Sequence, residues 1–509
     1  MSLSITEKEP IAAIATPIGE GGIAVLRVSG RGSIEKVQQI FKGVDLRKQA
    51  SHTVHFGRIL DANHRIVDEV LVSLFHAPKS YTGEETVEIS CHGGILVTQK
   101  VLESILRTGV RAAEAGEFTQ RAFLNGKLGL EQAEAVADLI HARSLKAVDA
   151  ANQQLSGSLG TYVRQFRQQI IDATAMIELE LDFIEEDVEF ANKEALQKLL
   201  EELQAAIQEL LLSYEAGRLI KDGIRTVLVG RPNAGKSTLL NALIGSERAI
   251  VTDIAGTTRD TVDAEWNYGG LLFRLIDTAG LRKTEDLVEA EGVKRSQKAV
   301  MEADVVVYTK DARTQFTAAE QEEITLLQQS APETPMIFVT TQMDRKTDSP
   351  THIQHGDTSD KRVTNTLNWS SYEQIQISAE TSEGLDSLKE LIKEHALKQT
   401  HYDGASLLVT SSRHRDALEK TLQHVDSALV GLSSDLTGDF LAIDLRAALQ
   451  QLGTITGEIT NEDILDSIFS LTGSFIITKI LSSFSNTLSS SLSSIPSCLY
   501  NAVSLSQHV

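Results

Sequence analysis

The feature that most constrains this chain is a glycine-rich stretch, Gly-Arg-Pro-Asn-Ala-Gly-Lys-Ser, at residues 230–237, directly after an apolar run at 227–229. Its spacing is G-x-x-x-x-G-K-[ST], in which two glycines let backbone N–H groups wrap around the phosphates of a nucleotide. Leucines and alanines at helical spacing follow, so we expect a strand, a phosphate-binding loop, and a helix starting near Thr238 that points its positive end at the anion. The alternative, a chance glycine turn between a strand and a helix, does not account for the complete motif.

The motif assigns nucleotide contacts to the loop and to the start of the helix. We expect the Lys236 ammonium to meet the β and γ phosphates and the Ser237 hydroxyl to bind Mg²⁺. The predicted contacts in this stretch are Asn233, Ala234, Gly235, Lys236, Ser237 and Thr238.

Two later segments occur in the order expected of a nucleotide-dependent switch. A polar loop at 252–260 contains Thr257 and Thr258, and a threonine at this distance can close over the γ phosphate and offer Mg²⁺ a second hydroxyl. A strand-like run then ends in Asp-Thr-Ala-Gly, whose aspartate can hold the metal through water and whose glycine N–H can sense the γ phosphate. A loop aspartate with no role is the alternative. The predicted contacts are Thr252, Asp253, Ile254, Ala255, Gly256, Thr257, Thr258, Asp277, Thr278, Ala279 and Gly280.

The choice between GTP and ATP depends on residues that follow two later strands. Guanine-specific GTPases usually carry Asn-Lys-x-Asp after the first of these, and here Thr341 and Gln342 replace the Asn and Lys while Asp344 remains. A charge-assisted bond from an aspartate to the guanine edge is worth roughly 1.5–3 kcal/mol, and adenine offers no matching pair of donors. Ser378 and Ala379 match the loop whose backbone contacts guanine O6. We therefore expect GTP to bind better than ATP, by a smaller margin than the full motif would give.

Composition limits the class of protein. The 509 residues are enough for about three domains, and the net charge of −22 argues against a surface that grips nucleic acid over its whole extent. Any RNA contact is therefore expected to be local or shared with a partner. Two cysteines, Cys91 and Cys498, exclude a disulfide framework. No signal-like segment and no run of ~18 apolar residues occurs, so we expect a cytoplasmic protein without membrane contact.

Hydrophobic periodicity predicts a multidomain protein with α/β and all-α parts. We expect an α+β unit at 1–127, a helical bundle in two halves at 128–218 and 397–470, an inserted P-loop domain at 219–396, and a poorly ordered, serine-rich tail at 471–509. Apolar residues spaced by three and four mark the helices: Val163, Phe166, Ile170, Ala173 and Ile177; Leu199, Leu203, Ile207 and Leu210; and Leu418, Leu422, Val425 and Leu429.

The α+β unit carries charged residues within predicted strands. Arg27 and Glu88 stand in apolar runs, where a charge is costly unless it faces solvent or a ligand. A ligand site and a solvated strand face are both open at this point. Cys91 and His92 raise the alternative of a metal ligand or nucleophile, but no other ligand pattern accompanies them.

Several motifs together resemble the tRNA modification GTPase family MnmE, also called TrmE, over roughly residues 8–470. They comprise Thr16-Pro with Gly-Gly-Ile-Ala-Val-Leu-Arg at 21–27, Gly-Glu-Phe-Thr-Gln-Arg-Ala-Phe-Leu-Asn-Gly-Lys at 116–127, Gln-Ala-Glu-Ala-Val-Ala-Asp-Leu-Ile at 132–140, the phosphate loop, Asp-Ile-Ala-Gly-Thr-Thr-Arg-Asp at 253–260, and Ile-Thr-Gly-Glu-Ile at 455–459.

The resemblance implies an N-terminal folate-binding-like domain through which the protein dimerises, and a helical domain with an inserted Ras-like G domain. Such proteins form a heterotetramer with the FAD-dependent protein MnmG (GidA). The complex adds a carboxymethylaminomethyl or aminomethyl group to C5 of the wobble uridine, U34, of certain tRNAs. The one-carbon unit comes from 5,10-methylenetetrahydrofolate or 5-formyltetrahydrofolate, with folate contacts implied at Arg27, Glu88 and Lys127.

The resemblance also implies a K⁺-stimulated hydrolysis of GTP that is activated when two G domains meet. It places K⁺ at Asn233, Thr252, Ile254 and Thr257, places Mg²⁺ at Ser237 and Thr258, and makes Glu289 the residue that orients water, with Lys236 and Asn233 as further catalytic residues. Leu281 stands where Ras-like enzymes carry a glutamine, so another group must orient the water. An exposed acidic helix at 285–291 without a catalytic part is the alternative for Glu289.

Two departures from the family pattern separate rival functions. The family ends in Phe-Cys-x-Gly-Lys, whereas here Phe469 and Ser470 are followed by unrelated sequence, and Thr341-Gln342 replaces Asn-Lys. The leading hypothesis is a GTPase subunit of the complex that modifies U34. Its rivals are a regulatory switch GTPase in ribosome assembly and a structural partner that has lost its chemistry.

Overall fold

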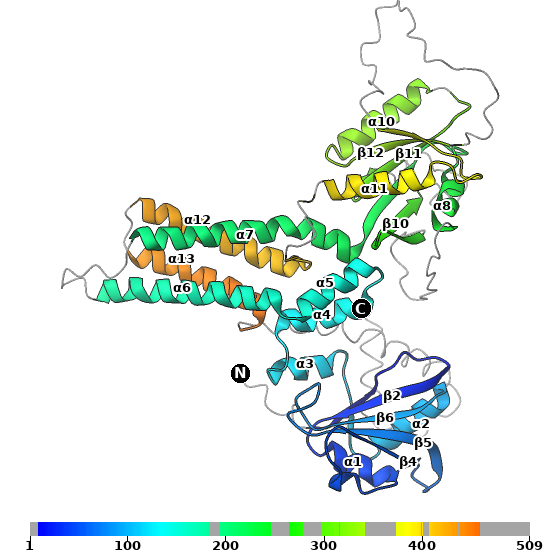
Figure 1. The fold of residues 1–509 in the computed structure, drawn as a ribbon, viewed down its shortest axis with the longest axis vertical. Helices are drawn as coiled ribbons and strands as arrows, with labels where there is room; N and C mark the ends of the chain where they lie inside the picture. Colours follow the sequence, from blue (N-terminus) through cyan, green and yellow to red (C-terminus); the bar gives the residue numbers. More distant parts are fainter. Residues whose placement is uncertain are drawn as a thin grey trace, which may run out of the picture. The chain divides into compact units, whose positions relative to one another are not determined.

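The computed structural model describes residues 9–182, 193–245, 264–277, 297–314, 316–341, 373–398, 400, 407–434 and 438–458. The chain divides into two compact units. Unit 1 comprises Met1–Ile140, Gln154–Gln169 and Leu449–Val509, and unit 2 comprises His141–Gln153 and Ile170–Ala448. Figure 1 shows the elements of each unit in sequence colours.

Unit 1 is built on a seven-stranded sheet of order β3-β4-β5-β6-β2-β1-β7. Its strands are β1 (Ile11–Ile14), β2 (Gly21–Ser29), β3 (Phe41–Lys42), β4 (Thr53–Leu60), β5 (Ile66–Phe75), β6 (Thr86–Gly93) and β7 (Arg111–Ala112). The helices are α1 (Ser33–Ile40), α2 (Ile95–Leu106), α3 (Glu117–Leu124) and α4 (Leu130–His141), with a short 3₁₀ helix, η1 (Leu46–Lys48).

Strand alternation gives this sheet one buried face. Leu26 and Val28 of β2 and Ile89 of β6 are fully buried, together with Val37 of α1 and Val101 of α2, which cover that face. The intervening residues of the same strands point to the opposite face, because successive side chains of a strand alternate. The sheet therefore has an open second face, on which the charged residues within the strands lie.

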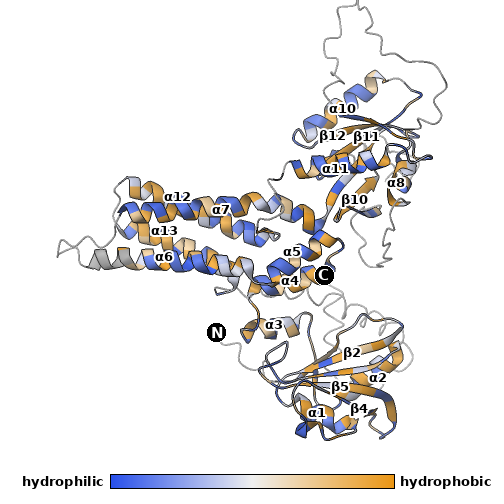
Figure 2. Ribbon diagram, viewed as in Figure 1, coloured by the Kyte–Doolittle hydropathy of each residue, from blue (hydrophilic) through white to orange (hydrophobic). Residues whose placement is uncertain are grey.

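Long helices form the all-α part: α5 (Leu145–Leu155), α6 (Ser158–Asp182), α7 (Lys193–Asp222), α12 (Ser412–Ser433) and α13 (Gly438–Thr456). The stripe predicted on α6, from Val163 to Ile177, is buried. On α7 the buried face is Leu196, Leu200, Leu203, Ile207 and Leu210, so the predicted Leu199 lies at its edge and is only half-buried. Helix α7 packs along α12, and Figure 2 shows hydrophobic and hydrophilic residues alternating along both. None of the described helices is long and apolar enough to cross a bilayer.

Unit 2 contains a six-stranded sheet of order β13-β12-β11-β8-β10-β9. The strands are β8 (Ile224–Val229), β9 (Ala264–Tyr268), β10 (Leu271–Asp277), β11 (Val305–Asp311), β12 (Met336–Thr341) and β13 (Gln374–Gln376), and the helices are α8 (Lys236–Gly245), α10 (Ala318–Ser330) and α11 (Leu385–Lys398). Strand β9 is antiparallel to β10, and the other pairs are parallel.

The sheet of unit 2 is buried on both faces. Leu228 and Val307 belong to one core, with residues of α8 and α11, while Val227 and Val306 belong to another, with residues of α10. Parallel strands covered on both sides are continuous apolar runs, as β8 and β11 are here. This arrangement leaves the carboxyl ends of the parallel strands free to carry polar residues.

The β9–β10 hairpin of this sheet lies against the start of α5. The Lys146 N–H donates to the Gly270 carbonyl at 3.0 Å. An ion pair between Arg143 and Glu265, at 2.6 Å, adds a second link. Residues more than a hundred positions apart in the sequence are thereby joined within unit 2.

The chain leaves α7 directly into β8 and returns through residues 407–411 into α12, and this returning segment contacts the C-terminal part of α7. The Val409 N–H donates to Ser213 Oγ at 3.1 Å. Gly217 faces the same segment so closely that a Cβ on it would lie 2.2 Å from the Val409 carbonyl oxygen. Only a glycine fits at this helical position without moving the backbone.

We predict that Gly217→Ala destabilises unit 2, although alanine ordinarily favours a helix. The methyl group would collide with backbone, and overpacking of this kind costs about 1–3 kcal/mol. Thermal unfolding followed by calorimetry should show a midpoint lowered by roughly 2–4 °C for each kcal/mol lost. Gly245→Ala is the matched control, because nothing lies within 4 Å of its added Cβ. Equal midpoints for the two variants would contradict the close approach.

Candidate functional site

The glycine-rich stretch forms a loop between β8 and α8. Gly230 has φ 140° and Gly235 has φ 86°, a region that favours glycine, and Asn233 also lies at positive φ, 64°. A Cβ on Gly230 would lie 2.3 Å from the Thr309 carbonyl oxygen. Helix α8 begins at Lys236, two residues earlier than the start expected near Thr238. The N–H groups of the first turn of α8 therefore come directly after Gly235.

The Lys236 side chain folds back onto the loop and binds two of its carbonyl groups. Only 5% of the residue is exposed, and its Nζ donates to the Gly230 carbonyl at 2.5 Å and to the Arg231 carbonyl at 2.7 Å. A buried ammonium and the positive end of a helix at one loop fit an anion, because each favours negative charge. The loop is therefore chemically suited to the phosphates of a nucleotide.

Other predicted contacts lie at the same edge of the sheet. Asp277 is the last residue of β10, which pairs in parallel with β8, so the two strands end together. Ser378, 2% exposed, follows β13, and its N–H donates to the Glu383 carbonyl at 3.0 Å. Because parallel strands present their carboxyl ends at one edge, the fold brings Lys236, Asp277, Ser378 and Ala379 to that edge.

The remaining nucleotide predictions lie outside the described residues. They are Thr252, Asp253, Ile254, Ala255, Gly256, Thr257, Thr258, Thr278, Ala279, Gly280, Glu289 and Asp344, and the tail at 471–509 also lies outside.

In unit 1, Arg27 and Glu88 face one another directly across β2 and β6. Their side chains form an ion pair of 2.7 Å and are each about one-quarter exposed, at 24% and 27%. The Arg27 guanidinium also lies 5.0 Å from the Tyr81 ring centre and 5.6 Å from that of Phe118. The two charges thus sit on the open sheet face, paired and flanked by aromatic rings, at a place where flat polar ligands can stack.

Lys127 reaches the same neighbourhood through the loop that precedes β6. Its Nζ donates to the Pro78 carbonyl at 3.2 Å, and its side chain packs where a Cβ on Gly83 would come within 3.2 Å. Tyr81 lies in this loop, so the loop joins Lys127 to the aromatic ring beside Arg27. Arg27 and Lys127 thus contact the same loop, Arg27 through the Tyr81 ring and Lys127 through the Pro78 carbonyl.

A buried ion-pair network contacts this loop at Glu84, near the start of β6. Arg121 of α3 is 4% exposed and bonds Glu117 at 2.8 Å and Glu84 at 3.3 Å. Arg111 bonds Glu117 at 2.5 Å. Burial alone raises the pKa of Glu117, but hydrogen bonds from Arg111, the Glu114 N–H and Arg121 outweigh it and hold that pKa below its ordinary value.

Neither the aromatic pair, Tyr81 and Phe118, nor this ion-pair network was expected from the sequence. One signal was present: Glu117 and Arg121 are four residues apart on one helix, the spacing of an ion pair. The contacts of Tyr81 and Phe118 with Arg27 depend on three separate segments, and no local pattern reveals them.

Cys91 and His92 are not arranged as a reactive pair. Cys91 is 3% exposed within the core of unit 1, and burial raises the pKa of its thiol. His92 points to the opposite face, where its Nδ1 lies 2.7 Å from Asp68. A raised thiol pKa disfavours the thiolate that metal binding and nucleophilic attack require.

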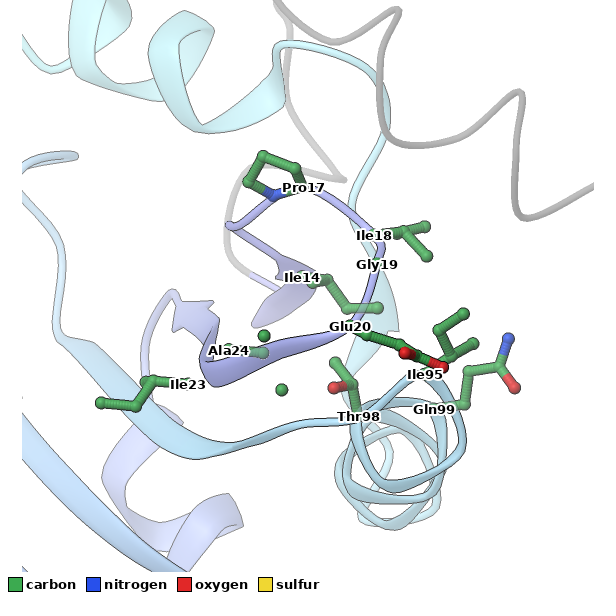
Figure 3. Close-up of a pocket in the computed structure, with 12 residues that line it drawn as sticks. Ile14, Pro17, Ile18, Gly19, Glu20, Ile23, Ala24, Ile95, Thr98 and Gln99 are labelled. Atoms are coloured by element: carbon green, nitrogen blue, oxygen red, sulfur yellow. The ribbon is translucent and has the colours of Figure 1, made fainter. Parts of the chain in front are cut away.

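Unit 1 also contains a cavity of about 190 Å³ between the start of β2 and the start of α2 (Figure 3). Ile14, Ala24 and Ile95 line it with apolar groups, and Glu20 and Gln99 supply polar atoms. Its lining includes none of Arg27, Glu88 and Lys127, so it is separate from the predicted folate contacts.

Comparisons with known proteins decide the family. The family description "MnmE helical domain" matches residues 130–471, and "GTP-binding protein TrmE N-terminus" matches residues 10–127. The tRNA modification GTPase MnmE of Christiangramia forsetii is 44% identical over 469 residues, which cover 91% of this chain and 98% of that protein. The chain belongs to the MnmE/TrmE family. The protein of the same name from Salinibacter ruber is 45% identical, over 92% of this chain and 99% of its own.

Family membership confirms the predicted multidomain α/β and all-α fold class. The N-terminal match covers a sheet with helices, and the match at 130–471 covers the long helices and the six-stranded sheet that lies between them in the sequence. A solved structure, the G domain of the T. maritima FeoB iron transporter, is 22% identical over 34% of this chain with a TM-score of 0.24, a likeness too weak to bear on function.

We predict that Glu117→Gln destabilises unit 1 strongly at neutral pH. Removing this carboxylate leaves Arg111 without its acidic partner and Arg121 with Glu84 alone, and breaking a buried pair costs roughly 3 kcal/mol or more. Because the folded pKa of Glu117 is lowered, its contribution is complete above the ordinary glutamate pKa of about 4.3 and is lost as pH falls through the folded pKa.

The measurement is the thermal unfolding midpoint of parent and variant from pH 7 to pH 3. The gap between them should be largest near neutral pH and should shrink below about pH 4. Glu103→Gln is the control, because Glu103 pairs with Arg107 on an exposed helix surface and should leave the midpoint nearly unchanged. A gap that does not vary with pH would contradict the role of the Glu117 charge.

Proposed function

We propose that this chain is the GTP-hydrolysing subunit of the complex that adds a carboxymethylaminomethyl or aminomethyl group to C5 of U34 in certain tRNAs. The observation that carries the proposal is the phosphate loop with its buried Lys236, at the carboxyl ends of the parallel strands of unit 2, in a chain whose relatives are named tRNA modification GTPases. The alternative, a ribosome-assembly switch GTPase, has no use for the unit 1 site, and the comparisons do not favour it.

In the proposed nucleotide site, residues of this chain bind the nucleotide and its cations and orient the attacking water. Lys236 and the first N–H groups of α8 hold the phosphates, and the hydroxyls of Ser237 and Thr258 would hold Mg²⁺. Asn233, with Thr252, Ile254 and Thr257, would hold K⁺. When bound, these cations would supply positive charge to the phosphates, as an arginine does in other GTPases. Glu289 orients the attacking water, and Asp344 with the loop at Ser378 and Ala379 selects guanine.

We assign Arg27, Glu88 and Lys127 to the binding of 5,10-methylenetetrahydrofolate or 5-formyltetrahydrofolate. A folate combines a flat polar pterin with an anionic glutamate tail. The aromatic rings beside Arg27 suit the pterin, while the exposed Lys127 ammonium suits the tail. The bound folate supplies the one-carbon unit.

The proposed partners are a second copy of the chain, the FAD-dependent protein MnmG and tRNA. The open sheet face of unit 1 supports the homodimer, because Ile23, Val54, Phe56 and Leu71 are 70%, 60%, 63% and 47% exposed on its strands. The net charge of −22 favours a local tRNA contact that is shared with the partner. We propose the cytoplasm as the compartment and domain boundaries near residues 127, 218, 396 and 470.

We predict that GTP hydrolysis depends on K⁺. Rates should be high in KCl and low in NaCl at equal ionic strength, and Asn233→Ala should abolish the difference. Glu289→Ala should lower kcat at least about tenfold, equivalent to roughly 1.4 kcal/mol, while GTP affinity stays nearly unchanged. Glu291→Ala is the matched control in the same acidic segment. Equal rates of GTP hydrolysis in both salts would show that K⁺ has no part in the mechanism. Full activity of Glu289→Ala would show that the acidic segment has no catalytic part.

The tRNA role is tested by mass spectrometry of U34 in bacteria that lack their own family member. We expect intact GTP hydrolysis but little or no modification from the unaltered chain, because unrelated sequence replaces the family's C-terminal Cys-x-Gly-Lys. Exchanging residues 471–509 for a family-type ending should restore modification, and Lys236→Ala in that background should abolish it. Normal GTP hydrolysis with no modification in the repaired chain would favour the ribosome-assembly alternative.

A further inference from the structure

We propose that two buried threonines, Thr309 and Thr341, hold the two glycine ends of the phosphate-binding loop and thereby aim the N–H groups that receive the phosphates. They are positioning residues, and the inference rests on the proposed function of the loop. Thr309 belongs to β11, which pairs with β8, and Thr341 ends β12, the next strand beyond β11.

Thr309 braces the first glycine. It is 1% exposed, and its Oγ1 donates to the Val229 carbonyl at 2.9 Å. A Cβ on Gly230 would lie 2.7 Å from the same Oγ1. The start of the loop is therefore both hydrogen-bonded to Thr309 and packed against it.

Thr341 braces the second glycine in the same manner. It is 2% exposed, and its Oγ1 lies 2.7 Å from the Ala234 carbonyl oxygen and 3.2 Å from that of Lys310. A Cβ on Gly235 would lie 3.0 Å from this Oγ1 and 3.2 Å from the threonine Cβ. One hydroxyl proton is shared between two carbonyls, so it is committed to the backbone.

The geometry of the peptide unit turns these bonds into control of the loop. A trans peptide is planar, and its C=O and N–H point in opposite directions. A bond that draws the Val229 carbonyl toward Thr309 turns the Gly230 N–H away from β11. A bond from Thr341 to the Ala234 carbonyl likewise turns the Gly235 N–H away from β12. Two hydroxyls thus set the direction of two backbone donors, one at each end of the loop.

The same contacts give Thr341 a role that its sequence position conceals. It stands where guanine-specific GTPases carry the asparagine of their base-recognition motif, yet its single proton is used on the loop. The strand that leads to the predicted guanine contact Asp344 is therefore tied directly to the phosphate site. Without the hydrogen bond from Thr341, the loop would adopt the binding-competent conformation for a smaller fraction of the time. The apparent affinity for nucleotide falls in proportion to that fraction.

The test compares Thr341→Val, which keeps the shape and removes the proton, with Thr341→Ser, which keeps the hydroxyl. We expect Thr341→Val to weaken binding of a fluorescent GDP at least about tenfold and Thr341→Ser to stay within about threefold, since an unsatisfied buried carbonyl is costly. Thr309→Val and Thr309→Ser should differ in the same direction. At saturating GTP, kcat should change less than about twofold, so that the loss appears in KM.

Thr226→Val is the matched control. Thr226 is fully buried in β8 of the same sheet, and its hydroxyl has no hydrogen-bond partner among the described residues, so its loss should leave GDP affinity unchanged. Unfolding midpoints without nucleotide should be similar for the Val and Ser variants of each threonine. If Thr341→Ser bound GDP as weakly as Thr341→Val, or if Thr341→Val bound GDP as tightly as the parent, the positioning role of Thr341 would be wrong. The proposed function of the loop would still stand. A parent chain that binds no GDP would overturn the proposed function together with the positioning role.

Discussion

The nucleotide site depends on how closely one loop can lie against two neighbouring strands. At Gly230 the loop passes the backbone of β11 at a distance that no side chain would permit, and at Gly235 it touches the end of β12. This approach requires β8 to lie beside β11 and β11 beside β12, which the sheet order provides. The apolar runs of β8 and β11, buried on both faces, are what hold those strands together.

Paired charge plays the corresponding part in unit 1. Arg27 and Glu88 satisfy one another across two strands, while Arg121 is held by Glu117 and Glu84 at the end of the loop that precedes β6. A buried charge without a partner is strongly destabilising, so the pairs of Arg121 keep Glu84 and the end of the loop in one place. The exposed Lys127 is bonded to the same loop, whose Tyr81 ring lies beside Arg27.

Contacts within unit 2 also join the nucleotide-binding sheet to helices outside it. The β9–β10 hairpin is bonded to α5 through Gly270 and Glu265, and β10 leads from there to Asp277 at the nucleotide edge. In α7, Gly217 packs closely against the segment that leads to α12, and Ser213 accepts a hydrogen bond from it. The sheet is thus fastened to long helices at two places.

The sequence by itself determined the phosphate loop, the long amphipathic helices and the family, because each depends on residue types at short, fixed spacings. Glycine at 230 and 235 and lysine at 236 identify a phosphate site wherever the strand and helix beside them fold. Only the tertiary structure decided that Arg27 and Glu88 face each other, since their pairing depends on the register of two strands some sixty residues apart. It likewise decided that Thr341 serves the loop. A hydrogen bond between residues 107 positions apart leaves no periodic trace in the sequence, and only the packing of β12 beside β11 brings its two ends together.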